Sequence, residues 1–376
     1  MRKFFRHASW VIILHLLLPA AQGQDTLTLL FIGDIMCHDA QIKAAWDTVT
    51  GRYDFREVFA EVAPLFQQAD VAVANLETTL AGPPYQGYPR FSSPDELAAA
   101  CKAAGIGTLV TANNHACDKG RKGIVRTANV LDLLDIRHTG TFRDTTDRKA
   151  NNLLVIRKGD LRTGLLNYTY GTNGLPAPSP TKVNRIDTAL MGRDIEEARR
   201  DSLDKLIVFL HWGEQYQQHP NGRQQAIARY LFSRGVDMII GSHPHVVQKM
   251  EYFPADSFRK ERLVVWSLGN FLSNQRKHPR DGGVMVQVTL VKDHDTTRIA
   301  GRGYYLTWVH KYSDGRKWHF RILPCAQYEQ DNFRGMDEYS VQQMKAFVRN
   351  ARILFQKENV NFEEITEYSL SVPQSR

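Results

Sequence analysis

The feature that most constrains the fold is an alternation of short β-rich runs with helix-like stretches that starts at residue 27. The predicted strands cover residues 27–32, 71–74, 108–111, 206–210, 238–240 and 263–266. A helical region is predicted near residues 55–68, and further helices are predicted over 95–104 and 223–234. Strands that alternate with helices in this way form a sheet with helices on its faces, so the sequence predicts an α/β fold.

The pattern changes after the last of these strands. Apolar and polar residues alternate, with Asp-Gly pairs between the runs, in residues 284–291, 304–312 and 318–323. Such alternation predicts an antiparallel meander that completes the main fold. Residues 338–358 are predicted to form a terminal helix. We therefore expect a signal segment over 1–23, one domain over 24–330 and a helical extension over 331–376.

The first residues have the order of a secretory signal peptide. Arg2, Lys3 and Arg6 precede an apolar run over 10–18, and small residues follow at 20–23. The run is shorter than the roughly 20 residues that a transmembrane helix needs, and no later segment is apolar enough to span a bilayer. We expect an exported protein of the periplasm, the cell envelope or the extracellular space, with a retained anchor as the alternative.

Charge and cysteine content narrow the class of protein further. Three of the cations behind the formal charge of +8 lie in the predicted signal segment, and the others are scattered without a dense basic block. This distribution argues against nucleic-acid binding and suits either an anionic substrate or an ordinary solvated surface. The four cysteines lie far apart with no Cys-x-x-Cys pair, so no disulfide framework or zinc ribbon is expected.

Side chains that can bind a metal follow the predicted strands. These segments are residues 33–38, 75–77, 113–118, 211–214 and 241–245. One such segment alone is commonly a turn or a cap, but in open α/β folds ligands gather beyond the carboxyl ends of the strands. Asp, Glu, Asn and His at five strand ends therefore predict one shared site.

The ligand types indicate which ions this site would take. Carboxylate, amide oxygen and neutral imidazole together suit divalent manganese, iron or zinc and disfavour a thiolate-dominated structural zinc site. A bridging carboxylate could hold two such ions roughly 3.5 to 4 Å apart. His243 and His245 would point to opposite faces of an extended segment, so a turn helped by Pro244 must bring both imidazoles to one cluster.

These motifs, in this order, resemble the capsule-synthesis CapA family, which is associated with poly-gamma-glutamate capsules and is related to calcineurin-like metallophosphoesterases. The resemblance spans roughly residues 27 to 275 and rests on Gly33-Asp34, Asn75-Leu76-Glu77, Asn113-Asn114-His115, His211-Trp212-Gly213, Gly241-Ser242-His243-Pro244-His245 and Ser267-Leu268-Gly269-Asn270-Phe271. It implies a four-layer α/β/β/α sandwich of the metallophosphoesterase type.

The resemblance also implies roles for the residues that match the motifs. Its metal ligands would be Asp34 and His245 for a first ion, Glu77 as the bridge, and Asn114, His211 and His243 for a second ion. His115 would face the leaving group as a general acid or transition-state donor. Asp118 would either orient His115 or merely start a helix.

Two departures from the phosphoesterase pattern bear on these roles. The Asp-x-His motif is absent because Met36 stands at the histidine position, which makes His38, two residues further on, an additional candidate ligand. Glu77 stands where phosphoesterases have an aspartate, so occupancy by a single ion stays open. Arg90 and Phe91 are candidates for a substrate rim.

We therefore expect a metal-dependent hydrolase or transferase that uses a metal-activated water on a phosphoester or on an amide-linked anionic polymer. Capsule-assembly proteins are the partners that the resemblance suggests. The alternative is a noncatalytic envelope component that binds or guides a capsule polymer. His115 favours catalysis, because a binding module needs ligands but not a positioned acid.

Overall fold

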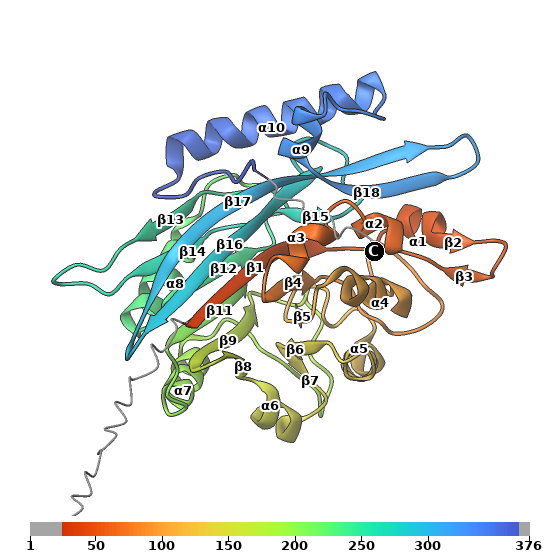
Figure 1. The fold of residues 1–376 in the computed structure, drawn as a ribbon. Coiled ribbons are helices and arrows are strands. Elements are labelled where there is room, and N and C mark those ends of the chain that lie inside the picture. Colours follow the sequence, from red (N-terminus) through yellow and green to blue (C-terminus); the bar gives the residue numbers. More distant parts are fainter. Residues whose placement is uncertain (1–24, 368–376) are drawn as a thin grey trace, which may run out of the picture.

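The computed structural model describes residues 25–367 (Figure 1). The predicted signal segment lies outside the described residues. Two large sheets form the centre of the molecule, and two small two-stranded sheets accompany them. One is the hairpin of β2 (Trp46–Asp47) and β3 (Arg52–Tyr53), and the other pairs β7 (Thr141–Phe142) with β10 (Lys182–Val183), which is distant in sequence.

The first sheet has the strand order β18-β17-β16-β1-β4-β5-β6, with β15 paired beside β1. Its strands are β1 (Asp25–Ile35), β4 (Val71–Leu76), β5 (Thr108–Val110), β6 (Arg137–Thr139), β15 (Asn270–Leu272), β16 (Gly282–Asp293), β17 (Thr296–Ser313) and β18 (Trp318–Pro324). The strands β1, β4, β5 and β6 are parallel, whereas β16, β17 and β18 are antiparallel. The meander therefore continues the parallel half of this sheet.

The second sheet has the strand order β13-β14-β12-β11-β9-β8. Its strands are β8 (Leu154–Lys158), β9 (Leu161–Thr169), β11 (Lys205–His211), β12 (Met238–Ser242), β13 (Met250–Phe253) and β14 (Arg262–Val265). The four inner strands are parallel, and β8 and β13 close the two edges in antiparallel pairs. Parallel strands buried on both faces explain the nearly continuous apolar runs in the sequence.

Helices cover the outer faces of both sheets. The helices on the side of the first sheet are α1 (Asp39–Ala45), α2 (Arg56–Phe59), α3 (Ala63–Gln67), α4 (Asp95–Ala104) and α5 (Gly120–Leu133). The second sheet is covered by α7 (Thr188–Arg199) and α8 (Gly222–Ser233). The remaining helices are α6 (Thr145–Asn151), α9 (Cys325–Gln330) and α10 (Glu338–Glu358).

Side chains of β1 show how the layers are joined. Leu29 and Phe31 point into the core between the sheets, whereas Leu30 and Ile32 pack under the helices of the first sheet. The alternation follows from the two-residue period of a strand. Because the second sheet repeats this arrangement against α7 and α8, the four-layer α/β/β/α sandwich is confirmed.

The terminal helix α10 packs over β17 at one edge of the sandwich (Figure 1). Met344 and Phe347 join the core between the sheets. Beyond α10, the Val360 N–H donates to Met250 of the second sheet, and the Ile365 N–H donates to Tyr304 of the first sheet. This segment therefore ties the two sheets together at that edge. The predicted domain boundary at residue 330 stays a prediction.

The helical region predicted near residues 55–68 consists of two short helices, α2 and α3, with a turn between them. Pro64 lies in the first turn of α3, where its missing N–H costs nothing, so it favours a helix start and opposes a continuous helix.

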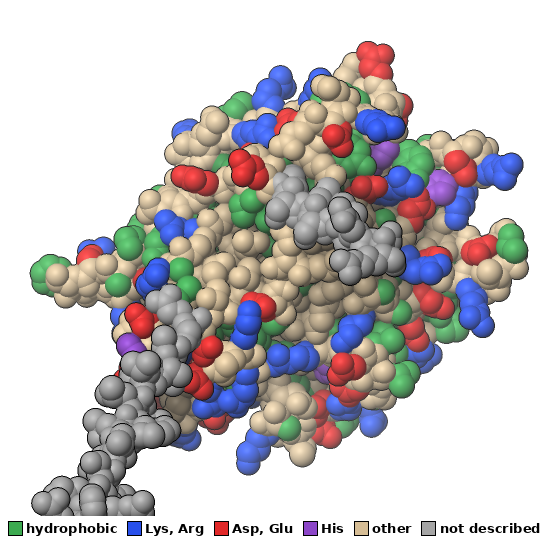
Figure 2. Space-filling model, in the orientation of Figure 1, with side chains coloured by type: hydrophobic (Ala, Val, Ile, Leu, Met, Phe, Trp, Pro, Cys, Tyr) green, Lys and Arg blue, Asp and Glu red, His purple; other side chains and the backbone are tan. Residues whose placement is uncertain are grey.

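The surface carries charges of both signs, and the cysteine thiols lie in the interior. Lys and Arg are interspersed with Asp and Glu over the face drawn in Figure 2. Between residues 25 and 367 no helix is long and apolar enough to cross a membrane. All four cysteines are buried and free.

A carboxylate joins α2 to the meander. Glu57 accepts hydrogen bonds from Tyr312 at 2.6 Å and from Arg321 at 2.7 Å, and it lies 2.8 Å from the His319 ring nitrogen. Burial raises the pKa of Glu57, but these three partners outweigh it and bring the pKa to about 2. A carboxyl with a lowered pKa stabilises the folded state above its unfolded pKa, and this contribution is lost as pH falls toward the folded value.

We expect Glu57→Gln to lower the free energy of unfolding at pH 7 by about 1 kcal/mol, a figure reduced for the partial exposure of the carboxyl. The difference from wild type should shrink between about pH 4.5 and about pH 2, because the wild-type carboxyl then takes up its own proton. Urea unfolding at several pH values measures it, with exposed Glu367→Gln as the control. A difference independent of pH would contradict this account.

Candidate metal centre

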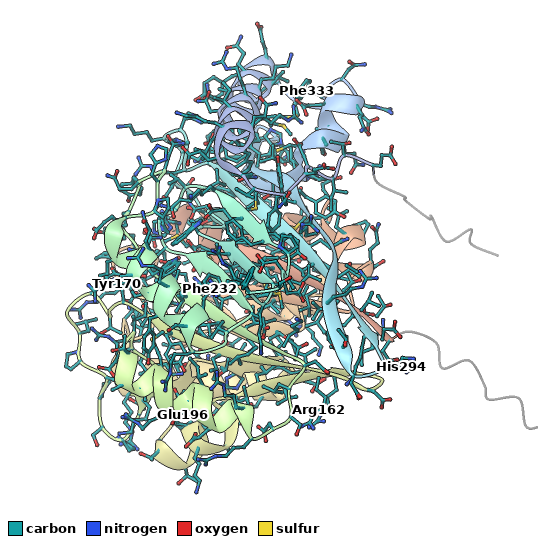
Figure 3. All side chains as sticks on the ribbon, turned by 90° about the vertical axis from the view of Figure 1, so that its left-hand side faces the viewer. Arg162, Tyr170, Glu196, Phe232, His294 and Phe333 are labelled. Atoms are coloured by element: carbon teal, nitrogen blue, oxygen red, sulfur yellow. The ribbon has the colours of Figure 1, made fainter. Side chains whose placement is uncertain are left out.

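The strand ends of both sheets meet at one end of the sandwich. The contributing residues are Asp34 in β1, Asn75 in β4 with Glu77 after it, Asn113, Asn114 and His115 after β5, His211 at the end of β11, and His243 and His245 after β12. Figure 3 shows this end at Tyr170, which follows β9, whereas His294 of the β16–β17 turn lies at the opposite end. The sandwich therefore gathers ligand-type side chains from two sheets.

The segment from Trp266 to Gly269, which passes from β14 of the second sheet to β15 of the first, makes close backbone contacts with both sheets. A Cβ on Gly33 would lie 2.2 Å from the Gly269 carbonyl oxygen, and one on Gly241 would lie 2.2 Å from that of Trp266. The Asp34 N–H donates to the same Gly269 oxygen at 3.0 Å. Only glycine allows such an approach, so Gly33 fixes where the neighbouring Asp34 side chain begins.

The segment with the two histidines forms the turn that the spacing predicts. His243 has φ of 99° and His245 has φ of 56°, a region that residues other than glycine rarely adopt. The His243 N–H donates to Asp34 at 3.3 Å, and the carbonyl of Pro244 accepts the Tyr216 N–H at 2.7 Å. The turn brings both imidazoles to the cluster at the cost of backbone strain, which is typical of functional sites.

Two groups of side chains have the spacing of metal sites. One consists of Glu77, His211 and His243, and the other of Asp34, Glu77 and His245. In each group the candidate ligand atoms lie within 4.8 Å of one another. Glu77 belongs to both groups, which is the position of a bridging carboxylate.

Glu77 also provides the test of whether these residues suit a metal. Its side chain is 0% exposed, and neither carboxylate oxygen has a hydrogen-bond partner among the described residues. Its Oε1 lies 3.5 Å from Nε2 of His211 and 3.8 Å from Nε2 of His245, beyond hydrogen-bond contact with either ring. A carboxylate buried without a partner costs several kcal/mol, and a bound cation would offset that cost. The donor set therefore fits divalent ions.

An amide oxygen completes the group around His211. Oδ1 of Asn114 lies 2.8 Å from Nε2 of His211, so the two ligand-type atoms are directed at the same place. Nδ1 of His243 is buried and has no hydrogen-bond partner among the residues described. These atoms are the donors expected for a second ion.

A second set of polar side chains orients the candidate ligands. Asn75 donates to Oδ1 of Asp34 at 2.8 Å, Ser242 lies 3.1 Å from Nδ1 of His211, and Asn270 lies 3.0 Å from Nδ1 of His245. Such partners fix the tautomer and the ring orientation of metal-binding histidines. Sequence reasoning gave Asn75 and Ser242 no role, although both stand inside the motifs.

The surroundings shift the pKa values of the two histidines of the turn in opposite directions. Burial and the neighbouring imidazoles lower the pKa of His243 well below its ordinary value, so its ring stays neutral and its nitrogens can coordinate. Burial also lowers the pKa of His245, but Glu77 and Asp34 outweigh it and raise the pKa to about 9. Burial raises the pKa of Asp34, but the hydrogen bond and charge of His245, together with His211 and Asn75, lower it below its ordinary value.

His115 lies outside both groups, and its neighbours hold it in one orientation. Its Nδ1 lies 2.7 Å from Oδ2 of Asp118, and the same oxygen accepts the Phe91 N–H at 2.7 Å. The Phe91 ring packs edge-on against the imidazole with centroids 4.6 Å apart. Helix α5 has Lys119 as its N-cap, so the Asp118 side chain contacts His115 rather than capping the helix.

His38 is the one predicted histidine ligand that the structure leaves outside both groups. Its Nδ1 accepts the Asn274 N–H at 3.3 Å, and its ring packs edge-on against Phe91 at 5.3 Å. Burial lowers its pKa to about 4. His38 therefore lies in the wall of the adjacent cavity, and its role as a ligand stays a prediction.

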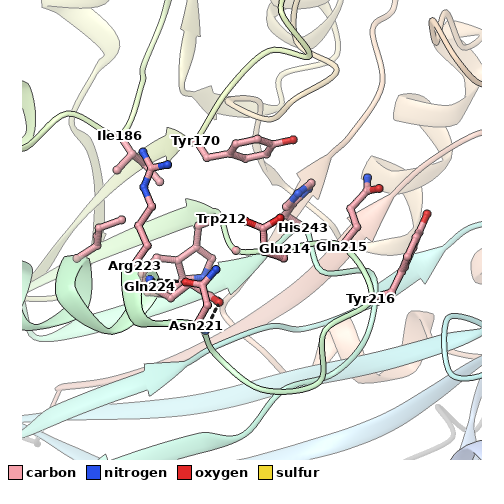
Figure 4. Close-up of a pocket in the computed structure, with 12 residues that line it drawn as sticks. Tyr170, Ile186, Trp212, Glu214, Gln215, Tyr216, Asn221, Arg223, Gln224 and His243 are labelled. Carbon is pink, nitrogen blue, oxygen red and sulfur yellow. Dashed lines mark hydrogen bonds between the residues drawn. The ribbon is translucent and has the colours of Figure 1, made fainter.

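Two cavities open beside the cluster. The larger, of about 590 Å³, is lined by Met36, His38, Arg90, Asn114, His115, Asp118, His245 and Arg280, among others. The smaller, of about 430 Å³, is lined by His243, Trp212, Glu214 and Arg223, among others (Figure 4). The candidate ligands thus lie where a substrate has room to reach them.

Comparison with solved structures gives a likeness of fold alone. The NAD nucleotidase of Haemophilus influenzae is 12% identical with a TM-score of 0.48, over 88% of this chain and 61% of that chain. The calcineurin-like phosphoesterase YfkN of Bacillus subtilis is 14% identical with a TM-score of 0.43, over 87% of this chain and 98% of that chain. At these values no activity is transferred.

Comparison with sequences identifies the family. The capsule biosynthesis protein CapA of Bacillus anthracis is 27% identical over 301 residues, which cover 77% of this chain and 70% of the relative. The PGA biosynthesis protein CapA of Bacillus subtilis is 27% identical over 280 residues, which cover 72% of this chain and 70% of the relative. The family model described as bacterial capsule synthesis protein PGA_cap matches residues 28–275, which include every candidate ligand, and the chain therefore belongs to that family.

Proposed function

We propose that this chain is an exported metal-dependent hydrolase or transferase that acts on an anionic envelope polymer or a phosphoester. The observation that carries the proposal is the buried, unpartnered Glu77 carboxylate shared by two groups of ligand atoms beside a cavity. A charge buried in this way is costly to keep for structure alone.

The proposed ligands are six of the seven predicted ones. They are Asp34 and His245 for one ion, Glu77 between the two, and Asn114, His211 and His243 for the other. Bound manganese, iron or zinc would supply an activated water and would neutralise charge that develops on the substrate. His38, the seventh, stays a prediction, because its Nδ1 accepts the Asn274 N–H and its ring lies in the wall of the larger cavity.

His115 is the proposed proton donor. Its Nδ1 is engaged by Asp118, so Nε2 is the atom left to exchange a proton with a substrate in the larger cavity. Because Phe91 holds both Asp118 and the His115 ring, the donor is oriented before substrate arrives. We propose general-acid assistance to the leaving group at this position.

The names of the relatives point to capsule polymers as the substrate class. Both CapA relatives are described as biosynthesis proteins, one for capsule and one for PGA. Arg90 and Arg280 in the larger cavity suit a polymer with anionic side groups, and capsule-assembly proteins are the proposed partners. The same two arginines would also serve a noncatalytic component that binds or guides such a polymer, which is the second candidate function.

An assay of the mature chain separates the two candidates. The protein is stripped of metal, reloaded with manganese or zinc, and incubated with an aryl phosphate, a phosphodiester and poly-gamma-glutamate. We expect metal-dependent turnover of at least one substrate, because a positioned His115 is of use only to catalysis. Tight polymer binding without turnover of any substrate would refute the enzyme proposal and support the binding component.

Two histidine variants test the division of roles. His115→Ala should keep its metal and lose turnover by about 100-fold or more, because a general acid typically contributes 10² to 10⁴ in rate. His243→Ala should lose metal together with activity. His38→Ala is the matched control and should retain metal, since it shares the cavity but neither ligand group. Metal analysis decides: equal depletion in the variants of His115 and His243 contradicts the assignment.

A further inference from the structure

The metal centre is reached from two sides. His243 lines the smaller cavity, and His245, the other histidine of the same turn, lines the larger one. Tyr170, Gln215 and Tyr216 line both cavities and stand between them. Figure 4 shows Tyr170, Glu214 and His243 around the inner end of the smaller cavity. A site that binds the end of a polymeric ligand would need only one of these two cavities.

Arg90 and Arg280 stand in the larger cavity. The Arg280 guanidinium lies 4.3 Å from the centroid of the Tyr216 ring. Its carbonyl accepts a 2.8 Å hydrogen bond from Asn270, the residue that contacts His245. Arg90 directly precedes Phe91, which holds Asp118 and packs on His115. Both cations are therefore placed by the same contacts that place the candidate ligands and the proton donor.

Arg223 stands in the smaller cavity. It lies in the first turn of α8, where Asn221 and Gln224 form a capping box with hydrogen bonds of 2.9 and 3.0 Å, drawn in Figure 4. Among the described residues, the ion pairs of arginines involve others, such as Arg126 and Arg234, and none involves Arg223, Arg90 or Arg280. Three guanidinium groups thus face the two cavities with their charge unneutralised.

We propose that the site takes an internal stretch of a linear polyanion, which crosses the metal centre from one cavity to the other. Arg90 and Arg280 hold negative groups on one side, and Arg223 holds a negative group on the other. Guanidinium suits carboxylate and phosphate alike, so the shared chemistry is a chain of repeated oxyanions. This inference rests on the proposed function. It adds that the affinity for the polymer rises with the length of the polymer until both cavities are occupied.

Glu214 provides a further test of whether the smaller cavity binds an anion. It is the acidic side chain that lines the smaller cavity, and its charge opposes an anion there. Glu214→Gln should therefore tighten the binding of a polyanion, whereas it would weaken the binding of a cationic group.

The test measures binding to the metal-loaded chain by fluorescence anisotropy. The probes are a short and a long γ-linked glutamate oligomer, polyphosphate of matched charge and a neutral γ-linked glutamine oligomer. We expect the long anionic probe to bind more tightly than the short one, and Arg280→Gln and Arg223→Gln each to weaken it about three- to tenfold, the range of partly exposed charge pairs. Whichever of the two polyanions binds more tightly shows whether the site prefers carboxylate or phosphate groups.

Two surface variants serve as controls. Arg229→Gln, on the exposed side of α8, matches Arg223→Gln, and Lys277→Gln matches Arg280→Gln. Neither control residue lines a cavity, so both variants should bind like the wild type. Metal content should stay unchanged in all of these variants, because none of the substituted residues is a proposed ligand.

Loss of affinity in Arg280→Gln but not in Arg223→Gln would overturn the inference, because binding would then be one-sided. Equal binding of the short and long probes, or equal binding of the neutral probe, would overturn it as well. Failure of the proposed function is a separate result. Absent turnover with intact, two-sided binding would refute the enzyme and leave this inference standing.

Discussion

The site depends on the buried Glu77 carboxylate, which has ion-pair contacts with His211 and His245 but accepts no hydrogen bond from the described residues. Glu77 follows β4 of the first sheet, and its carboxylate faces His211 and the 243–245 turn of the second sheet, with no hydrogen-bond partner among the described residues. Burying such a group costs several kcal/mol unless a cation offsets it. The close packing at Gly33 and Gly241 and the strained φ values of His243 and His245 all serve to bring ligands around this carboxylate.

Much of the fold follows from local sequence patterns. The apolar run of β1 and the periodic pattern of α10 are strong signals, and both elements form where expected. The hairpin of β8 and β9 was not predicted, because buried polar residues interrupt its apolar pattern. Asn167 in β9 accepts the Ala112 N–H at 2.7 Å and donates to the Phe209 carbonyl at 3.1 Å, so its burial depends on partners distant in sequence.

The site was predictable to the extent that its ligands stand directly at strand ends. His211 ends β11, and its place follows once the strand is recognised. His38 stays a predicted ligand, and the structure places it beyond β1 in the wall of the larger cavity. The pairing of β1 with β15 shifts register between Asp34 and Ile35, and the Met36 N–H then donates a hydrogen bond to the Leu272 carbonyl at 2.8 Å. As a result His38 lies against Asn274 and Phe91. The two cavities depend on loops whose conformations follow from tertiary contacts, such as that of Tyr216 with Pro244.

The central claim is that Glu77 is a shared metal ligand. Crystals grown with manganese, measured for anomalous scattering, test this most directly. The account predicts two peaks about 3.5 to 4 Å apart, each about 2.0 to 2.2 Å from an oxygen of Glu77, with His211 and His243 beside one and Asp34 and His245 beside the other. Ions bound elsewhere, with both Glu77 oxygens left uncoordinated, would contradict it.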